Sequence, residues 1–134
     1  MDTGQLHTSM PLCEVLGIRV AAAAADEVVL QLDWSPSLCT TGGLLHGGAV
    51  MALADSAGGV CAFLNLPEGA GTSTIESKTN FLGAVREGTI TAAARPLHVG
   101  GTTGVDVTDA SPGPDFHVPP DVTADATPAL GVFE

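Results

Sequence analysis

The chain has 134 residues, a formal net charge of −11 and a hydrophobic fraction of 45%. This length suits a single domain, and the hydrophobic fraction is high enough to build a core and to exclude wholesale disorder. Aromatic residues make up only 4%, and fifteen acidic residues stand against four basic ones. Because nucleic-acid surfaces need stacking aromatics and clustered positive charge, the composition predicts no nucleic-acid partner.

No segment of the sequence predicts export, a disulfide framework or a zinc site. The three cysteines have no paired spacing, and residues 1–5 lack the basic and apolar regions of a signal peptide. Residues 42–66 are mostly apolar and long enough to span a bilayer, but they include His46 and Asp55 and have no flanking Lys or Arg. We therefore expect a cytoplasmic protein with no membrane partner, no metal and no cofactor.

The first third of the chain predicts a short helix and then a β-hairpin. The first residues carry little pattern, and residues 11–16 fit a helical turn that Gly17 would close. Residues 28–34 alternate apolar and polar side chains toward their end, as a half-buried strand does. They follow a strand that begins at Ile18, with the hairpin turn near residues 26–27.

The longest uninterrupted segment of the sequence predicts an apolar helix. It follows a loop over residues 35–43, where proline and paired glycines break regular structure. From His46 to about Leu64 the chain has no proline and is apolar nearly all round. That pattern is typical of a helix that is buried on every side.

Strands are predicted after the helix. Residues 72–85 and 89–98 fit two strands with a turn at residues 87–88 between them, and residues 102–107 fit a short third strand. One face of the second strand carries Ile90, Ala92 and Ala94. A hairpin, one long buried helix and consecutive strands, in this order, predict an α+β fold with an antiparallel sheet.

The last residues differ in composition from the rest. Residues 110–134 contain five prolines and no Lys or Arg, and residues 101–134 hold six of the fifteen acids. Such sequence resists regular structure, so we expect a domain over residues 1–109 and then an irregular tail that supplies no final strand. The composition of the tail is what a shifted reading frame would give.

Two glycines and one acid mark the candidate site. Gly47 and Gly48 stand where the helix begins, and glycines there let a ligand approach unpaired N–H groups and the positive end of the helix dipole. A carbonyl oxygen bound at that end would be polarised, as in an oxyanion hole. Asp55 is the only acidic or basic residue of the helix, which suits a general base or a nucleophile.

Each of these residues also has a purely structural interpretation. The two glycines could form only a tight junction between loop and helix, and Asp55 could be a buried carboxylate satisfied by hydrogen bonds. His46 could cap or orient the start of the helix, or it could act as a general base. A phosphate-binding P-loop is excluded, because no Lys–Ser or Lys–Thr pair follows the glycines.

Three motifs together resemble one enzyme family. They are LHGGAVMALADSA at residues 45–57, NFLGAVREG at residues 80–88 and RPLHVG at residues 95–100. In this order and spacing they are similar to the signatures of the PaaI-type acyl-CoA thioesterases. The similarity covers residues 12–108 and identifies a family rather than a substrate.

The resemblance implies a hotdog fold, in which an antiparallel sheet wraps around the long helix, and a homodimer or a dimer of dimers. It implies that the backbone N–H of Gly47 binds the thioester carbonyl of an acyl-CoA substrate. It also implies that Asp55 of the other protomer activates water or attacks the carbonyl. The remaining candidate residues are His46 and Thr74 for catalysis, and Gly48, Thr40 and Phe81 for substrate binding.

The chain departs from the family pattern at three places. Thr40 stands where many members have an Asn that helps to hold the loop, Gly101 replaces a basic residue, and the final strand is missing. These departures leave open a non-catalytic acyl-CoA-binding protein. A third interpretation is a hydratase or dehydratase, in which His46 would act together with Asp55.

Overall fold

The computed structural model describes residues 1–100, 103–111 and 129–133. Its helices are α1 (Thr3–Ser9), α2 (Pro11–Leu16), the short 3₁₀ helix η1 (Pro36–Leu38) and α3 (Gly47–Leu64). Its strands are β1 (Arg19–Ala23), β2 (Val28–Asp33), β3 (Thr72–Glu76), β4 (Thr89–Val99), β5 (Thr103–Ser111) and β6 (Ala129–Phe133).

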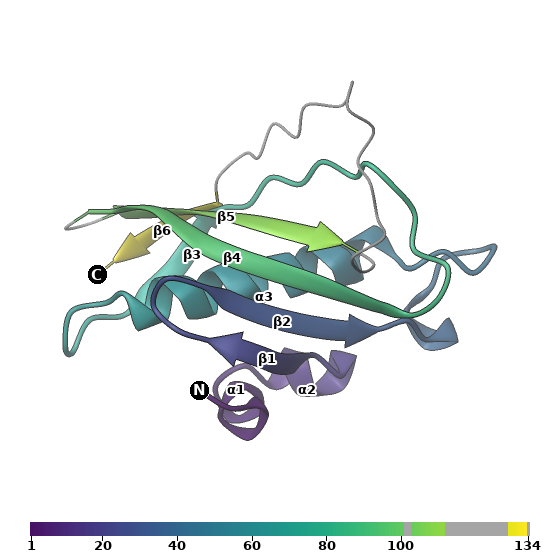
Figure 1. Cartoon of the computed structure of the whole chain (residues 1–134), viewed down its shortest axis with the longest axis horizontal. Coiled ribbons are helices and arrows are strands. Elements are labelled where there is room, and N and C mark those ends of the chain that lie inside the picture. Colours follow the sequence, from purple (N-terminus) through teal and green to yellow (C-terminus); the bar gives the residue numbers. More distant parts are fainter. Residues whose placement is uncertain (101–102, 112–128, 134) are drawn as a thin grey trace.

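The six strands form one antiparallel sheet in the order β1-β2-β4-β5-β6-β3. The sheet lies over one side of the long helix α3, and the short helices α1 and α2 lie beside β1 at one edge (Figure 1). The opposite edge is β3, which pairs only with β6 within the described residues. The prediction of an α+β fold, with one long helix against an antiparallel sheet, is confirmed.

End residues define the two N-terminal helices. The Asp2 carboxylate accepts a bond from the Gln5 backbone N–H at 2.9 Å, and the Gln5 side chain accepts one from the Asp2 N–H at 2.8 Å. This capping box begins α1, which the sequence pattern did not predict because the helix buries only one side chain, Leu6. The predicted turn at residues 11–16 is α2, and Gly17 closes it with a left-handed φ of 75°.

The core lies between α3 and the central strands β2 and β4. Both strands alternate buried and half-exposed residues along their central parts, as predicted, and Leu30 of β2 stands opposite Ala92 of β4. The alanines of β4 are small, so α3 can pack closely against the sheet. The buried side chains of the two strands are Val28, Leu30, Leu32, Ile90, Ala92 and Ala94.

The long helix is buried on one face only, so the prediction of burial on every side is wrong. Met51 and Phe63 on the other face are 38% and 54% exposed. The sequence could not show this difference. A run of apolar residues looks the same in the sequence whether other parts of the chain cover every face of the helix or leave one face exposed. By length and hydropathy alone α3 could also cross a membrane, as the core helix of a soluble protein often can. The residues buried on the packed face include Ala49, Leu53, Ala57, Val60 and Cys61.

The predicted strand over residues 72–85 is too long. Strand β3 ends at Glu76, and residues 77–88 connect it to β4 without regular structure. Its pairing partner β6 has only five residues, so within the described residues nothing offers hydrogen bonds to a longer β3. The alternation of polar and apolar residues in this segment was therefore a misleading strand signal.

The C-terminal residues contain a strand that the sequence did not predict. Ala129–Phe133 form β6 between β5 and β3, with Gly131 opposite both Gly104 and Thr74. The expectation of no final strand is therefore wrong for these five residues, because pairing on both edges can hold a segment that has little pattern of its own. Residues 112–128 of the predicted irregular tail lie outside the described residues, and the division of the chain at residue 109 stays a prediction.

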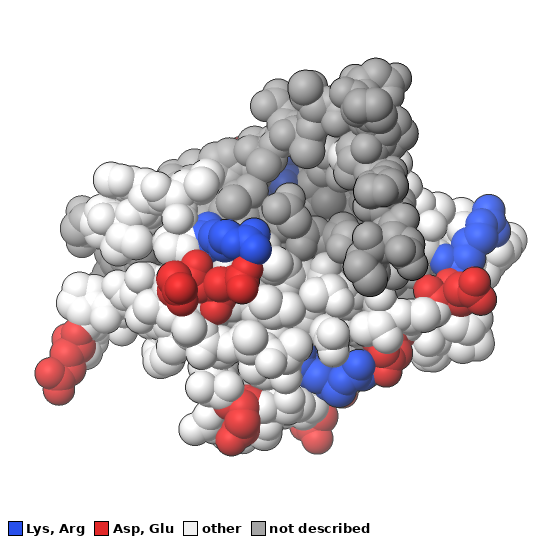
Figure 2. Space-filling view, viewed as in Figure 1, with Lys and Arg blue, Asp and Glu red and all other residues white. Residues whose placement is uncertain are grey.

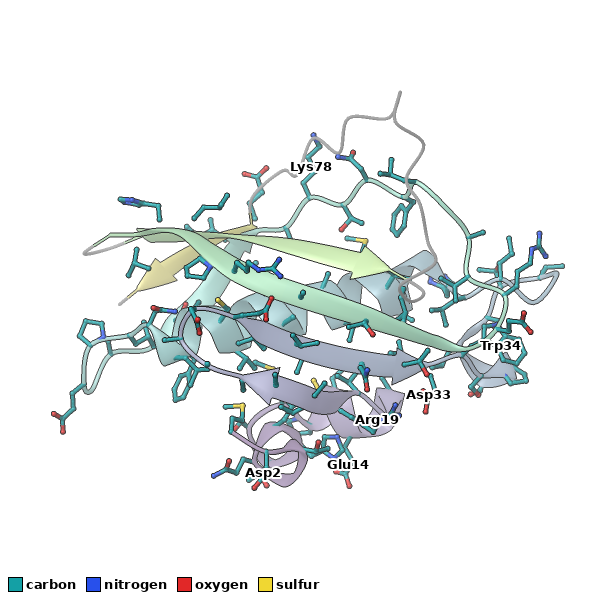
Figure 3. The ribbon with its side chains drawn as sticks, viewed as in Figure 1. Asp2, Glu14, Arg19, Asp33, Trp34 and Lys78 are labelled. Carbon is teal, nitrogen blue, oxygen red and sulfur yellow. The ribbon has the colours of Figure 1, made fainter. Side chains whose placement is uncertain are left out.

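Among the described residues, two ion pairs cross the outer part of the sheet. Arg19 of β1 donates to both carboxylate oxygens of Asp33, at 2.6 and 3.0 Å, and the Thr89 hydroxyl donates to the same carboxylate at 2.7 Å (Figure 3). Arg95 pairs with Glu27. On the face drawn in Figure 2 most basic groups lie next to acidic ones.

Stability should depend on pH through Asp33. The hydrogen bonds from Arg19, and then from Thr89, lower the pKa of this carboxyl from its ordinary value of 3.8 to about 2. The stabilisation is therefore fully present above the ordinary pKa and is lost as the pH falls through about 2. Because both side chains are about half exposed, at 43% and 56%, the effect is at most about 1 kcal/mol.

The measurement is the melting temperature of the wild type and of Asp33→Asn as a function of pH. We expect the wild type to melt higher above about pH 4, and the difference to close between about pH 4 and pH 2. The matched control is Asp26→Asn in the hairpin turn, where the described residues provide no ion pair. A difference between wild type and Asp33→Asn that stays constant over this pH range would contradict the assignment.

Candidate active site

A loop held by several hydrogen bonds leads from β2 to the start of α3. The Trp34 indole donates to the Gly43 carbonyl at 3.0 Å, and the Trp34 backbone N–H donates to the Gly88 carbonyl at 2.7 Å (Figure 3). The N–H and the hydroxyl of Thr40 both donate to the Leu44 carbonyl, at 2.7 and 3.3 Å. The last residue of the loop is therefore held in place before the helix begins.

His46 caps α3, as one of its two interpretations predicted. Its ring nitrogen Nδ1 accepts a hydrogen bond from the Gly48 N–H at 2.8 Å, and its carbonyl accepts one from the Ala49 N–H at 2.9 Å. An Nδ1 that accepts carries no proton, so the neutral ring has its proton on Nε2. Because this ring nitrogen is already used by the helix, the cap favours an orienting role for His46 over the role of general base.

The backbone N–H of Gly47 is left without a partner by this cap. Gly47 is the first residue of α3, and no hydrogen bond within the described residues uses its N–H. The Phe81 ring touches this glycine: its Cζ and Cε1 atoms lie 3.1 and 3.3 Å from the position that a Cβ of residue 47 would occupy. Glycine is thus favoured at position 47 because the Phe81 ring comes close, and not because the backbone is left-handed. The structure therefore brings together two of the predicted site residues, Gly47 and Phe81.

Asp55 lies on the same helix but far from Gly47. Eight residues separate the two, which corresponds to about 12 Å along a helix axis. The Asp55 side chain is half-buried, and within the described residues it forms no hydrogen bond or ion pair. One copy of the chain therefore cannot place the Gly47 N–H and the Asp55 carboxylate on the same small group.

The other predicted residues are spread over the loop and the sheet edge. Thr40 is exposed and closes the loop through Leu44, so it holds the loop although it is not the Asn of the family pattern. Thr74 is exposed on the edge strand β3, and no hydrogen bond in the described part of the chain joins it to Asp55. Gly101 lies outside the described residues.

Two residues that support the site were not identified from the sequence. Trp34 holds the loop, and the carbonyl of Val85 accepts a hydrogen bond from the Leu45 N–H at 2.9 Å, which ties the segment carrying Phe81 to the residue before His46. A signal existed for Trp34, since it is the only tryptophan and its indole N–H needs a partner when half-buried. No sequence signal existed for Val85, because a backbone hydrogen bond between distant segments does not depend on the type of side chain.

Replacement of Trp34 tests the loop. Trp34→Phe keeps the aromatic ring but removes the bond to the Gly43 carbonyl, and we expect a loss of about 1 kcal/mol in the free energy of unfolding, measured by urea titration. The control is Ser37→Ala, which removes a hydroxyl pair on the exposed part of the same loop and should cost less than about 0.5 kcal/mol. Equal losses in the two variants would mean that the indole bond does not hold the loop.

No metal site is evident in the part of the chain that the structure describes. No three side chains of His, Cys, Asp or Glu gather there in a way that could hold an ion. The cysteines Cys13, Cys39 and Cys61 form no disulfide bond. The chemistry that the described residues offer is therefore a hydrogen-bond donor at a helix start and a separate carboxylate.

Comparison with known proteins gives a consistent family. The sequence model of the Thioesterase superfamily matches residues 42–106. The protein PA1618 of Pseudomonas aeruginosa is 33% identical over 107 residues, which are 78% of this chain and 74% of PA1618. A Listeria monocytogenes protein named 1,4-dihydroxy-2-naphthoyl-CoA hydrolase is 29% identical over 96 residues, which are 72% of this chain and 78% of that protein.

Solved structures agree with the sequence comparisons. The crystal structure of a mutant of the thioesterase PA1618 superposes with a TM-score of 0.77 at 28% identity, covering 99% of this chain and 91% of that one. The thioesterase HI1161 of Haemophilus influenzae gives a TM-score of 0.74 at 26% identity, covering 96% of this chain and 82% of that one. The protein is therefore a thioester hydrolase with the hotdog fold, and it belongs to the Thioesterase superfamily.

Proposed function

We propose that the protein hydrolyses an acyl-CoA thioester to a carboxylic acid and free CoA, at sites shared between the two protomers of a homodimer. The observation that carries this proposal is the open N–H of Gly47 at the start of α3. The relative from Listeria monocytogenes, named as a hydrolase of a CoA thioester, supports the substrate class. Of the four basic residues, Lys78 and Arg86 form no ion pair within the described residues. Both lie on residues 77–88, the segment whose Phe81 touches Gly47.

The start of α3 would bind the thioester carbonyl. Its oxygen accepts a hydrogen bond from the Gly47 N–H and lies at the positive end of the helix dipole. Both effects grow when the carbonyl oxygen becomes negative in the tetrahedral intermediate, so they lower the barrier rather than only tighten binding. The His46 cap keeps the Gly48 N–H occupied and thereby holds the first turn of the helix in one arrangement.

Asp55 of the other protomer would supply the second half of the chemistry. As a general base it takes a proton from water, whose oxygen bonds to the carbonyl carbon, and the C–S bond then breaks to release the CoA thiolate, which is protonated. As a nucleophile it forms a mixed anhydride with release of CoA, and water then hydrolyses the anhydride. Thr74 would orient the water in either route.

The separation of Gly47 and Asp55 supports the proposal of a homodimer, or of a dimer of such dimers. A second copy can bring its own Asp55 to the Gly47 of the first, which one chain cannot do. Two features of the monomer are consistent with such a partner: the outer edge of β3 is unpaired among the described residues, and Met51 on α3 remains exposed.

The test is release of free CoA thiol from a panel of aliphatic and aryl acyl-CoA thioesters, together with the molar mass in solution by light scattering. We expect turnover of at least one class and a mass of two or four chains. Tight acyl-CoA binding without turnover would instead establish the non-catalytic alternative. That alternative is favoured by the presence of Thr40 where many family members have an Asn. A hydratase is not supported, because Nδ1 of His46 already caps the helix and Asp55 lies nine residues farther along the chain.

A further inference from the structure

We propose that Phe81 determines substrate specificity and favours acyl-CoA thioesters with a flat, apolar acyl group; this inference rests on the proposed function. Phe81 lies on residues 77–88, and its side chain is 54% exposed. The tip of its ring is fixed against Gly47, with Cζ 3.1 Å, Cε1 3.3 Å and Cε2 3.7 Å from the position of a Cβ on that residue. An exposed aromatic ring thus touches the residue that carries the open N–H group.

The segment that carries the ring is tied to the start of α3 by a backbone hydrogen bond. Val85, only 8% exposed, accepts a hydrogen bond from the Leu45 N–H at 2.9 Å. Leu45 directly precedes the cap residue His46, so the segment that carries Phe81 and the start of α3 are tied together two residues before Gly47. This bond holds the segment of Phe81 close to the residue that carries the open N–H group.

This geometry places the acyl group against the ring. A carbonyl oxygen bound to the Gly47 N–H lies about 2.9 Å from that nitrogen, so the first atoms beyond the carbonyl come within contact distance of the ring. An aryl group there can make an edge-to-face contact and also covers the half-exposed ring, whereas a methyl group has too few atoms to do either. The residue thus discriminates by the shape of the acyl group and not by charge.

The experiment measures binding of two unreactive CoA thioethers by calorimetry. S-phenacyl-CoA and S-acetonyl-CoA carry the same ketone oxygen and differ only in a phenyl group against a methyl group. We expect Phe81→Ala to raise the dissociation constant of S-phenacyl-CoA about fivefold, which corresponds to the loss of one aromatic pair contact. The dissociation constant of S-acetonyl-CoA should rise less than about twofold. Phe81→Leu, which keeps an apolar side chain without a ring, should fall between Phe81→Ala and the wild type for S-phenacyl-CoA.

The matched control is Phe63→Ala. Phe63 is also 54% exposed, but it lies about 24 Å from Gly47 along α3, so its loss should change neither dissociation constant. Equal weakening of both ligands by Phe81→Ala, no weakening of either, or no binding of either ligand by the wild type would overturn the inference. The proposed function is judged separately by thiol release: a wild type that prefers S-phenacyl-CoA but hydrolyses no thioester would overturn hydrolysis and leave the role of Phe81 supported.

Discussion

Gly47→Pro should lower kcat by about 10²- to 10³-fold while the protein stays folded, because proline removes the N–H that is proposed to bind the thioester oxygen. Proline suits this position in two ways. Gly47 is the first residue of α3, where the helix does not use the N–H, and its φ is not positive. The preceding residue, His46, has φ −65° and ψ 132°, which is the extended conformation that a following proline requires.

The control for this variant is Gly47→Ala. Both replacements place a Cβ against the Phe81 ring tip, 3.1 Å away, but only proline removes the N–H. We expect the alanine variant to be at least about tenfold more active than the proline variant, since it keeps the oxyanion donor. The measurements are steady-state thiol release and the melting temperature of both variants. Equal activity of the two would show that the N–H is not the donor and that only the contact with Phe81 matters.

Asp55→Asn should lower kcat by about 10²- to 10⁴-fold with little change in stability. Asparagine has nearly the shape of aspartate, and within the described residues the Asp55 carboxylate forms no hydrogen bond or ion pair that the substitution would break. The measurement is thiol release in single turnover and in steady state. Asp26→Asn makes the same chemical change in the exposed hairpin turn and should leave the rate unchanged.

The two inactive variants together test whether the site is shared between protomers. Chains with Gly47→Pro and chains with Asp55→Asn, each carrying a different affinity tag, are expressed together, and the doubly tagged dimer is purified. One of its two sites then combines an intact Gly47 with an intact Asp55 from the other chain, so we expect about half of the wild-type activity. A mixed dimer no more active than its parents would contradict the shared site, and full activity of Asp55→Asn alone would contradict the role of the carboxylate.

The secondary structure that depends on local pattern was predictable. The hairpin of β1 and β2, the long helix and β4 follow from alternation, from the absence of proline and from glycine at the ends, and all lie within a few residues of their predicted positions. The elements that failed are those with weak local signals. The helix α1 depends on two cap bonds between Asp2 and Gln5, and β6 depends on pairing with strands on both sides.

The candidate site divides in the same way. The sequence by itself determined which groups could bind a carbonyl oxygen or act as a base or nucleophile. Glycines at the start of an apolar helix and a single acid within it can be recognised from the order of residues alone. Only the tertiary structure decided that His46 caps the helix, that Phe81 lies against Gly47, and that Trp34 and Val85 hold both segments. The His46 cap is local, and the structure only chose between its two interpretations. The contacts of Phe81 with Gly47, of Val85 with Leu45 and of Trp34 with Gly88 join residues 34, 40 and 54 positions apart. They depend on where the chain returns in space, which no local preference encodes.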